Sequence, residues 1–166
     1  MVTLYNVVSA DGFIARPDGN EDFIPDSLWP RTLELFSRYD TVAMGRKTYE
    51  ALQAYPDELL KPFEALPVKK VVVSRDPDFK LKSGYALVRS PREACALGEN
   101  VLVTSGPTLN GSVVDDKLAE KVILHRLPVK IGEGVKPFPF NPEHALALES
   151  ERPLGDGVVE SIYRIS

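Results

Sequence analysis

Short apolar stretches, rich in β-branched residues, alternate with amphipathic segments along the first two-thirds of the chain. Val71, Val72 and Val73 run consecutively, as is usual in strands buried on both faces of a sheet. Gly, Pro, Asp and Asn bound most of these stretches, which is typical of strand ends. The predicted strands are Val2–Ser9, Thr41–Met44, Lys69–Ser74, Tyr85–Val88, Val101–Thr104 and Glu120–Leu127.

Segments with a helical spacing of apolar residues lie between these strands. Ser27–Tyr39 carries one apolar face, with Asp26 or Ser27 available as its N-cap and Pro30 in its first turn. Ala10–Asp26, ahead of it, has the composition of a long loop, and long loops in small domains are often functional. The predicted helices are Ser27–Tyr39, Arg46 to about Leu52, Pro91–Leu97 and Pro107 to about Val114, with one helical turn at Asp57–Leu60.

The C-terminal third has strand patterns with no helix between them. His144–Glu151 and Val158–Ile165 flank the turn-rich Pro153–Gly157, which indicates an antiparallel pair. The strand–helix alternation before it predicts a mostly parallel sheet covered on both faces. We therefore expect one three-layer α/β domain over residues 1–166, with antiparallel C-terminal edge strands and helices on both faces of a central sheet.

Composition narrows the class of protein. The chain has 166 residues, 43% of them hydrophobic, and a net charge of −4, which argues against general nucleic-acid binding. Its one cysteine, Cys95, excludes an intramolecular disulfide and is compatible with the cytoplasm. One cysteine and two histidines argue against a zinc site. We recognise neither a signal peptide nor a membrane-spanning pattern, so the expected location is cytoplasmic and the expected partner a small molecule.

The first candidate binding site follows the predicted strand Thr41–Met44. Gly45 has no side chain to keep a ligand from the backbone, and the helix that starts behind it has unpaired N–H groups. Arg46, Lys47 and Thr48 add two cations and a hydroxyl. Together these groups suit a phosphate or pyrophosphate. The alternative is an ordinary strand–turn–helix joint with solvated side chains.

Two further strand ends have similar chemistry. Ser74 and Arg75 follow a buried strand, where an arginine favours a nucleotide 2′-phosphate over a free ribose hydroxyl. The alternative for Arg75 is an ion pair with Asp76 or Asp78 in an exposed turn. The segment Ser105, Gly106, Pro107, Thr108 is a strand-to-helix turn that can offer backbone N–H groups to a pyrophosphate, or is simply a turn.

Three apparent motifs do not support other chemistry. Gly132 and Gly134 are followed by Pro137 where a dinucleotide fingerprint needs a third glycine. The turn at Gly45 lacks the earlier glycine of a P-loop. Val103 stands where a nucleophile elbow around Ser105 requires glycine, and a histidine within a strand pattern, as at position 125, is more often a packed residue than a catalyst.

Five segments in order resemble one known group of proteins. The chain is similar to the dihydrofolate reductase-like superfamily, most of all to the reductase half of the bacterial riboflavin-biosynthesis deaminase/reductase and its stand-alone relatives. The resemblance covers nearly the whole chain. The segments are Val-Ser-Ala-Asp-Gly-Phe-Ile-Ala at 8–15, Met-Gly-Arg-Lys-Thr-Tyr-Glu at 44–50, Val-Val-Ser-Arg at 72–75, Ser-Gly-Pro-Thr-Leu-Asn-Gly at 105–111 and Pro-Val-Lys-Ile-Gly-Glu-Gly at 128–134.

The resemblance implies an NADPH-dependent reductase, often a homodimer. It assigns the cofactor phosphates to the residues at 45–48, the 2′-phosphate to those at 74–75, and the pyrophosphate and nicotinamide to those at 105–108. It places Asp11 and Glu133 on the substrate side, where they would orient the substrate or relay a proton. Their alternatives are a turn-forming aspartate and a solvated loop glutamate.

The chain also departs from the superfamily. Ser105–Gly106 replaces a common Gly-Gly turn, and by resemblance we expect its peptide bond to be cis. Asp26 lies at a helix start where a capping role is expected, and Glu34 is expected to be exposed, which argues against folate reduction. No deaminase half is present in the chain. We expect reduction of a ribosylaminopyrimidine phosphate or of a related carbonyl or imine. The alternatives are a nucleotide-binding module without turnover and a pteridine reductase.

Overall fold

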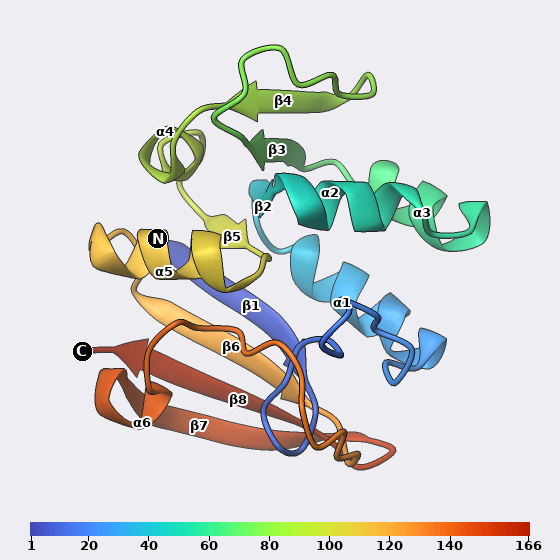
Figure 1. Ribbon diagram of the computed structural model, residues 1–166, viewed down its shortest axis with the longest axis vertical. Helices are drawn as coiled ribbons and strands as arrows, with labels where there is room; N and C mark the ends of the chain where they lie inside the picture. The colour runs from blue at the N-terminus through green and yellow to red at the C-terminus, as the bar shows by residue number, and fades with distance from the viewer.

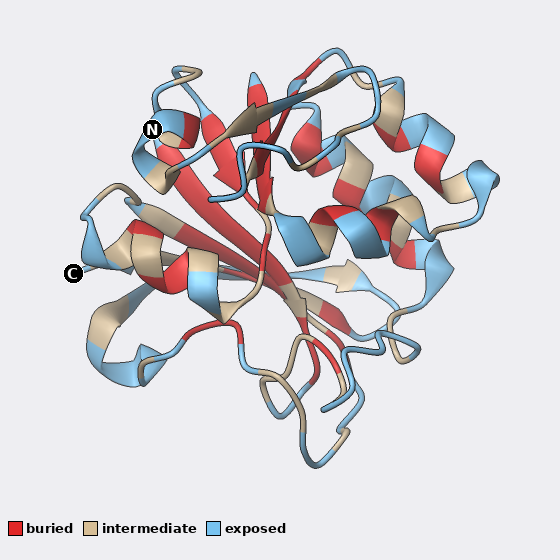
Figure 2. Cartoon of the chain, turned by 45° about the horizontal axis from the view of Figure 1, so that its top comes forward, coloured by how far each residue is buried: buried red, intermediate tan, exposed pale blue.

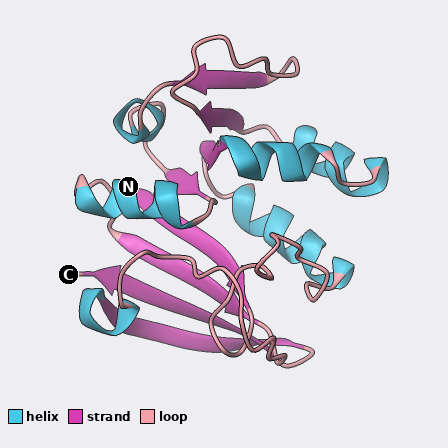
Figure 3. Ribbon diagram, viewed as in Figure 1, coloured by secondary structure: helices cyan, strands magenta, loops and turns pink.

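An eight-stranded sheet forms the middle layer of the structure, a computed structural model that describes all residues from Met1 to Ser166 (Figures 1 and 3). The strand order is β4-β3-β2-β5-β1-β6-β8-β7. Strands β1 to β6 are parallel to one another, and β8 is antiparallel to both β6 and β7, as the sequence predicted. The strands are β1 (Val2–Val8), β2 (Thr41–Gly45), β3 (Lys69–Val73), β4 (Tyr85–Val88), β5 (Val101–Val103), β6 (Lys121–Arg126), β7 (Leu146–Gly155) and β8 (Val158–Ile165).

Helices cover both faces of this sheet (Figure 1). Helices α1, α2 and α3 pack on one face, and α4 and α5 pack on the other. None of the helices is both long and apolar enough to cross a membrane. The helical elements are the 3-10 turn η1 (Asp26–Leu28), α1 (Trp29–Phe36), α2 (Arg46–Gln53), α3 (Asp57–Glu64), α4 (Pro91–Cys95), α5 (Pro107–Asp115) and α6 (Pro142–Ala145).

The core lies on both sides of the central strands, whose residues are nearly all buried (Figure 2). On β2, Val42 and Met44 belong to the apolar cluster under α1, α2 and α3, whereas Ala43 belongs to the cluster under α4 and α5. Successive side chains of a strand point to opposite faces, so two covered faces require an unbroken apolar run. This explains why the strands were recognisable in the sequence.

The start of α1 differs from the prediction. The N-cap position of η1 is Pro25, and neither Asp26 nor Ser27 makes a side-chain capping bond, so the expected cap is wrong. The first turn is instead a 3-10 turn in which the backbone N–H of Trp29 bonds to the carbonyl of Asp26. Backbone groups therefore replace the side-chain cap. Glu34 is exposed, as expected.

Two other helices differ from the prediction. Helix α3 continues past Pro62 to Glu64, because Leu60 and Phe63 are both buried against the α1 side of the core. Helix α6 was not predicted; Asn141 caps it by accepting the Glu143 N–H at 3.0 Å, and β7 consequently begins at Leu146 instead of His144. Tertiary burial and a local cap outweighed the strand pattern at these places.

Candidate functional site

Two predicted turns meet at the carboxyl ends of β2 and β5. These strands are adjacent and parallel, and the helices that follow them, α2 and α5, pack on opposite faces of the sheet. Ligands of open α/β sheets bind at such a switch point. The Gly45 N–H donates to Ser105 Oγ at 3.1 Å, and a Cβ on Gly45 would lie 3.0 Å from the same oxygen. Gly45 therefore provides close approach between the two turns, while its own N–H is engaged.

Two buried asparagine side chains hold the Ser105 turn in place. Its carbonyl accepts hydrogen bonds from Asn6 Nδ2 at 2.8 Å and Asn110 Nδ2 at 3.1 Å, and both asparagines are buried. The Ser105–Gly106 peptide bond is trans, since the structure contains no cis peptide bond, so that prediction is wrong. Gly106 has an extended backbone conformation as the N-cap of α5, and the trans chain enters the helix directly.

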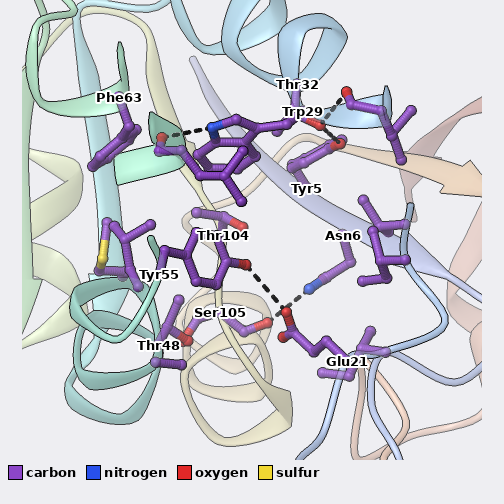
Figure 4. A pocket seen from close by; sticks show the side chains of 18 of the residues that line it. Tyr5, Asn6, Glu21, Trp29, Thr32, Thr48, Tyr55, Phe63, Thr104 and Ser105 are labelled. Atoms are coloured by element: carbon purple, nitrogen blue, oxygen red, sulfur yellow. Dashed lines mark hydrogen bonds between the residues drawn. The ribbon is translucent and has the colours of Figure 1, made fainter. Parts of the chain in front are cut away.

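A cavity of about 600 Å³ opens beside this turn on the α1 side of the sheet (Figure 4). One end of the cavity consists of Lys47, Thr48, Ser105 and Gly106, and we call it the cofactor end because these residues were predicted to bind NADPH. The far end includes Glu21, Trp29, Tyr55 and Phe63. Thr48 Oγ1 lies 3.4 Å from Ser105 Oγ, so a hydroxyl of each turn lies at the cofactor end. The structure thus brings four of the predicted cofactor residues to one wall of one cavity.

Aromatic rings form the far end. The ring centroid of Trp29 lies 5.6 Å from that of Tyr55 and 6.4 Å from that of Phe63. The indole Nε1–H donates to the Leu59 carbonyl at 2.8 Å, which leaves the indole without a free donor and fixes its orientation. The sequence pattern had assigned Trp29 only to the apolar face of a helix. Its position in a cavity wall depends on how α1 packs against α3.

Three acidic residues line the cavity, Glu21, Asp22 and Asp26, and Glu21 bonds to the aromatic wall. The Tyr55 hydroxyl donates to Glu21 Oε2 at 3.3 Å and so links the loop after β1 to the connection between α2 and α3. Glu21 is an exposed residue, but the protein around its carboxyl partly removes it from water and raises its pKa, and the Tyr55 hydrogen bond offsets only part of that effect. Sequence reasoning missed both residues; the only signal was the length of the loop that contains Glu21.

The two predicted substrate-side carboxylates lie elsewhere. Asp11 accepts hydrogen bonds from Ser9 Oγ at 2.6 Å and from the backbone N–H groups of Ile131 and Gly132 at 3.2 and 2.8 Å. The Ser9 bond, with those backbone donors, lowers the pKa of Asp11 to about 2. Asp11 therefore joins two loops as a carboxylate. Glu133 is exposed on the second of these loops, and neither residue lines the cavity, so their catalytic roles stay predictions.

Two arginines, Arg46 after β2 and Arg75 after β3, lie at the same edge of the sheet. Arg75 is exposed and forms no ion pair, so the alternative pairing with Asp76 or Asp78 is absent. Arg46 is partly engaged: its Nε donates to Glu50 at 3.0 Å and its guanidinium lies 4.5 Å from the ring centroid of Phe79. Arg75 is therefore the freer of the two cations for a ligand. Ser74, next to it, is half-buried and accepts the Asp76 N–H at 3.3 Å, while Pro107 and Thr108 form the first turn of α5.

Comparisons with known proteins were made for sequence and for structure. No family model matches the chain. An uncharacterized Bacillus subtilis protein, YwjB, is 25% identical over 165 residues, which cover 93% of this chain and 92% of that protein. Sequence similarity therefore identifies a relative without a known activity.

Three solved structures resemble the fold. One is a Shewanella sp. PV-4 protein provisionally assigned to riboflavin biosynthesis, with a TM-score of 0.71, 20% identity, and coverage of 99% of this chain and 98% of that one. A second is the Thermotoga maritima diaminohydroxyphosphoribosylaminopyrimidine deaminase/5-amino-6-(5-phosphoribosylamino)uracil reductase, with a TM-score of 0.73 and 16% identity; all of this chain matches 56% of it. A third is the Enterococcus faecalis dihydrofolate reductase, solved with NADP(H) and RAB-propyl, with a TM-score of 0.71, 16% identity, and coverage of 100% and 96%. At these identities the likeness establishes a shared fold.

Proposed function

We propose that this protein, a chain with the dihydrofolate reductase-like fold, is an NADPH-dependent reductase of a small carbonyl or imine compound. The observation that carries the proposal is the contact between the Gly45 and Ser105 turns at the wall of an aromatic cavity. A cofactor laid across the two turns would reach from the cavity to the exposed Arg75. The rest of the cavity leaves room for a flat substrate beside it.

The residues around the two turns fit NADPH. A Cβ on Gly106 would meet nothing within 4 Å, so the approach to the N-terminus of α5 is open. Lys47 and Thr48 would bind the pyrophosphate together with backbone N–H groups of α2 and of α5, where Pro107 has no N–H to donate and Thr108 supplies the first one in the helix. Ser74, Arg75 and the less available Arg46 would bind the 2′-phosphate. When bound, NADPH supplies the hydride, and the protein positions the substrate for it.

The far end of the cavity would hold the substrate. Trp29 and Tyr55 offer aromatic surface for a flat ring, and the Glu21 carboxyl offers acceptors for its N–H groups. The likeness to the Thermotoga maritima reductase makes a ribosylaminopyrimidine phosphate the first substrate to test, and the likeness to dihydrofolate reductase makes a pteridine the second. Asp11 would act indirectly, by holding the loop at 128–134 through the N–H groups of Ile131 and Gly132, whereas Glu133 is exposed on that loop and makes no contact that holds it.

A binding module without turnover is the second candidate. The observation that favours it is the hydroxyl of Ser105, which occupies space between the two turns and engages the Gly45 N–H. Such a protein would bind NADPH and leave it unoxidised. It differs from a reductase only in the chemical step.

Two measurements test the proposal in sequence. NADPH should raise the free energy of unfolding by about 2.7 kcal/mol at a concentration about 100 times its Kd, because it binds the folded state. The NADPH absorbance band is then followed with ribosylaminouracil phosphate, pteridine and quinone substrates. Absence of thermal stabilisation by NADPH contradicts both candidates; stabilisation without oxidation favours the binding module.

We also infer that the protein is a cytoplasmic homodimer, by likeness to the superfamily. Light scattering coupled to gel filtration measures the mass in solution directly. A mass equal to the 18.4 kDa of one chain would contradict the dimer.

A further inference from the structure

Three buried ionisable side chains form a connected series beneath the cavity. The Tyr5 hydroxyl lies 2.9 Å from His125 Nδ1, and His125 Nε2 lies 2.9 Å from Glu160 Oε2. The residues come from β1, β6 and β8, and their exposed fractions are 2%, 1% and 6%. A phenol, an imidazole and a carboxylate are therefore joined in one line across the neighbouring strands β1, β6 and β8.

The phenol end of this series reaches the candidate site. Tyr5 lines the 600 Å³ cavity together with Thr32, whose Oγ1 is 3.1 Å from the Tyr5 hydroxyl (Figure 4). The hydroxyl of Thr32 also bonds to the Leu28 carbonyl at 3.3 Å. Tyr5 is thus the member of the series that a ligand in the cavity can contact, and His125 and Glu160 lie behind it.

The charged groups around the series define its resting state. Arg152 Nε donates to Glu160 Oε1 at 2.7 Å. Burial raises the pKa of Glu160, but the bonds from Arg152 and His125 outweigh it and hold the pKa below its usual range. Burial lowers the pKa of His125, and the charges of Arg31 on α1 and of Arg152 act in the same direction, against the bond to Glu160. Glu34, on α1, faces Arg152 and favours its charge.

These charges fix the direction of the hydrogen bonds. An ionised Glu160 accepts the Nε2–H of a neutral His125, so Nδ1 is the acceptor for the Tyr5 hydroxyl. If His125 gains a proton, it does so at Nδ1, through Tyr5, and Glu160 stabilises the resulting imidazolium. The arrangement can therefore hold one proton behind the cavity wall, and it does so more readily toward acidic pH, because burial and the two arginines lower the pKa of His125.

We propose that Tyr5 delivers to the substrate the proton that the reduction consumes, and that His125 with Glu160 stores this proton; the inference rests on the proposed function. Hydride addition forms a C–H bond at the carbonyl or imine carbon, and the π electron pair moves to the oxygen or nitrogen. That atom takes the Tyr5 hydroxyl proton, and Tyr5 takes the Nδ1 proton of the His125 imidazolium. His125 becomes neutral, and a proton from the bulk solvent (hydronium or buffer acid), relayed by water in the cavity and by Tyr5, protonates it again before the next substrate binds. Tyr5 is the catalytic residue, and His125 and Glu160 act through it.

The first test needs no turnover, because it reads the ring nitrogens of the two histidines by NMR. His144 is exposed on α6 and serves as the internal control. Neutral His125 should carry its hydrogen on Nε2. Tyr5→Phe removes the donor to Nδ1 and should raise the pKa of His125, whereas Glu160→Gln removes the anion and should lower it; His144 should not change. A hydrogen on Nδ1, or a titration of His125 indifferent to both variants, overturns the inference.

The second test compares single-turnover hydride transfer at different pH values. Tyr5→Phe should slow this step about 100-fold or more without weakening NADPH binding. In the wild type the rate should fall as the pH rises above the pKa of His125. His125→Gln should be slow and independent of pH, and His144→Gln should behave as the wild type. A merely structural role would lower the melting temperature of His125→Gln and leave the pH slope intact, which would contradict the inference.

Failure of the reductase proposal itself is distinguishable from these outcomes. A protein that does not bind NADPH, or binds it without turnover on any substrate, contradicts the reductase and with it the delivery step. The NMR titration still decides whether the proton store exists.

Discussion

The cofactor end and the far end of the cavity are built in different ways. Lys47, Thr48, Ser105 and Gly106 come from two turns at the ends of adjacent strands, and much of what they offer is backbone geometry. The far end is assembled from side chains of a loop, two helices and the connection between helices. The geometry of the first end is set by the two turns, whereas the geometry of the second end depends on how the helices pack.

The largest expected effect tests the proposed 2′-phosphate site at Arg75. Arg75→Ala should weaken NADPH binding about 10- to 100-fold, because a charge-assisted hydrogen bond contributes about 1.5–3 kcal/mol. NADH, which lacks the 2′-phosphate, should bind equally to both proteins, and Ser74→Ala should act in the same direction as Arg75→Ala, less strongly. Calorimetric titration of each nucleotide measures this, with Arg92→Ala, an exposed arginine on α4, as the control. Equal losses for the two nucleotides would reopen the choice of cofactor.

The next effect tests the contact between the two turns. Gly45→Ala places a Cβ 3.0 Å from Ser105 Oγ and should cost about 1 kcal/mol, or a fall in Tm of about 2–4 °C. Adding Ser105→Gly vacates that space and should restore most of the loss. Thermal unfolding of the two single variants and the double variant measures the coupling. Simple additivity of the two changes would mean that the turns do not constrain each other.

A smaller effect tests the carboxyl group at the far end. The raised pKa of Glu21 means that the folded state holds its proton more tightly than the unfolded state, so the ionised form opposes folding at neutral pH. Glu21→Gln should therefore unfold at a higher temperature than the wild type at neutral pH. The difference should disappear as the pH falls through the pKa of Glu21. Melting curves across this range measure it, and Glu133→Gln, exposed and unpaired, should match the wild type throughout. If Glu21→Gln is less stable than the wild type at neutral pH, the ionised carboxyl stabilises the folded state and this prediction is wrong.

The smallest effect sharpens the contrast between Glu21 and Asp11. The pKa of Asp11 is lowered from 3.8 to about 2, so its contribution to stability is present above 3.8 and is lost as the pH falls toward 2. The wild type should be more stable than Asp11→Asn at neutral pH, and the two should converge over that acidic range. This is the opposite sign to Glu21, and acid titration of unfolding detects it. A constant difference down to the lowest pH would contradict the carboxylate-to-loop contact.

Most of the strands and the turns at the cofactor end could be predicted from the sequence alone, because both depend on interactions between residues close together in the chain. Buried parallel strands need an unbroken apolar run, and a turn that opens a helix needs residues such as Gly45 at a fixed place. Those signals lie within a few consecutive residues, so local sequence is sufficient to predict the strand ends at Gly45, Ser74 and Ser105. Their assignment to NADPH came from the resemblance and still awaits binding data.

The residues that form the far end of the cavity, and the buried series Tyr5, His125 and Glu160, could be identified only from the tertiary structure. The hydrogen bond between Tyr55 and Glu21 joins residues 34 positions apart in the chain, and the one between Tyr5 and His125 joins residues 120 positions apart. No local sequence pattern predicts either contact. The same holds for α3, which passes through Pro62 because Phe63 behind it is buried in the core. Long-range packing selects such contacts, and the sequence specifies them only through the complete fold.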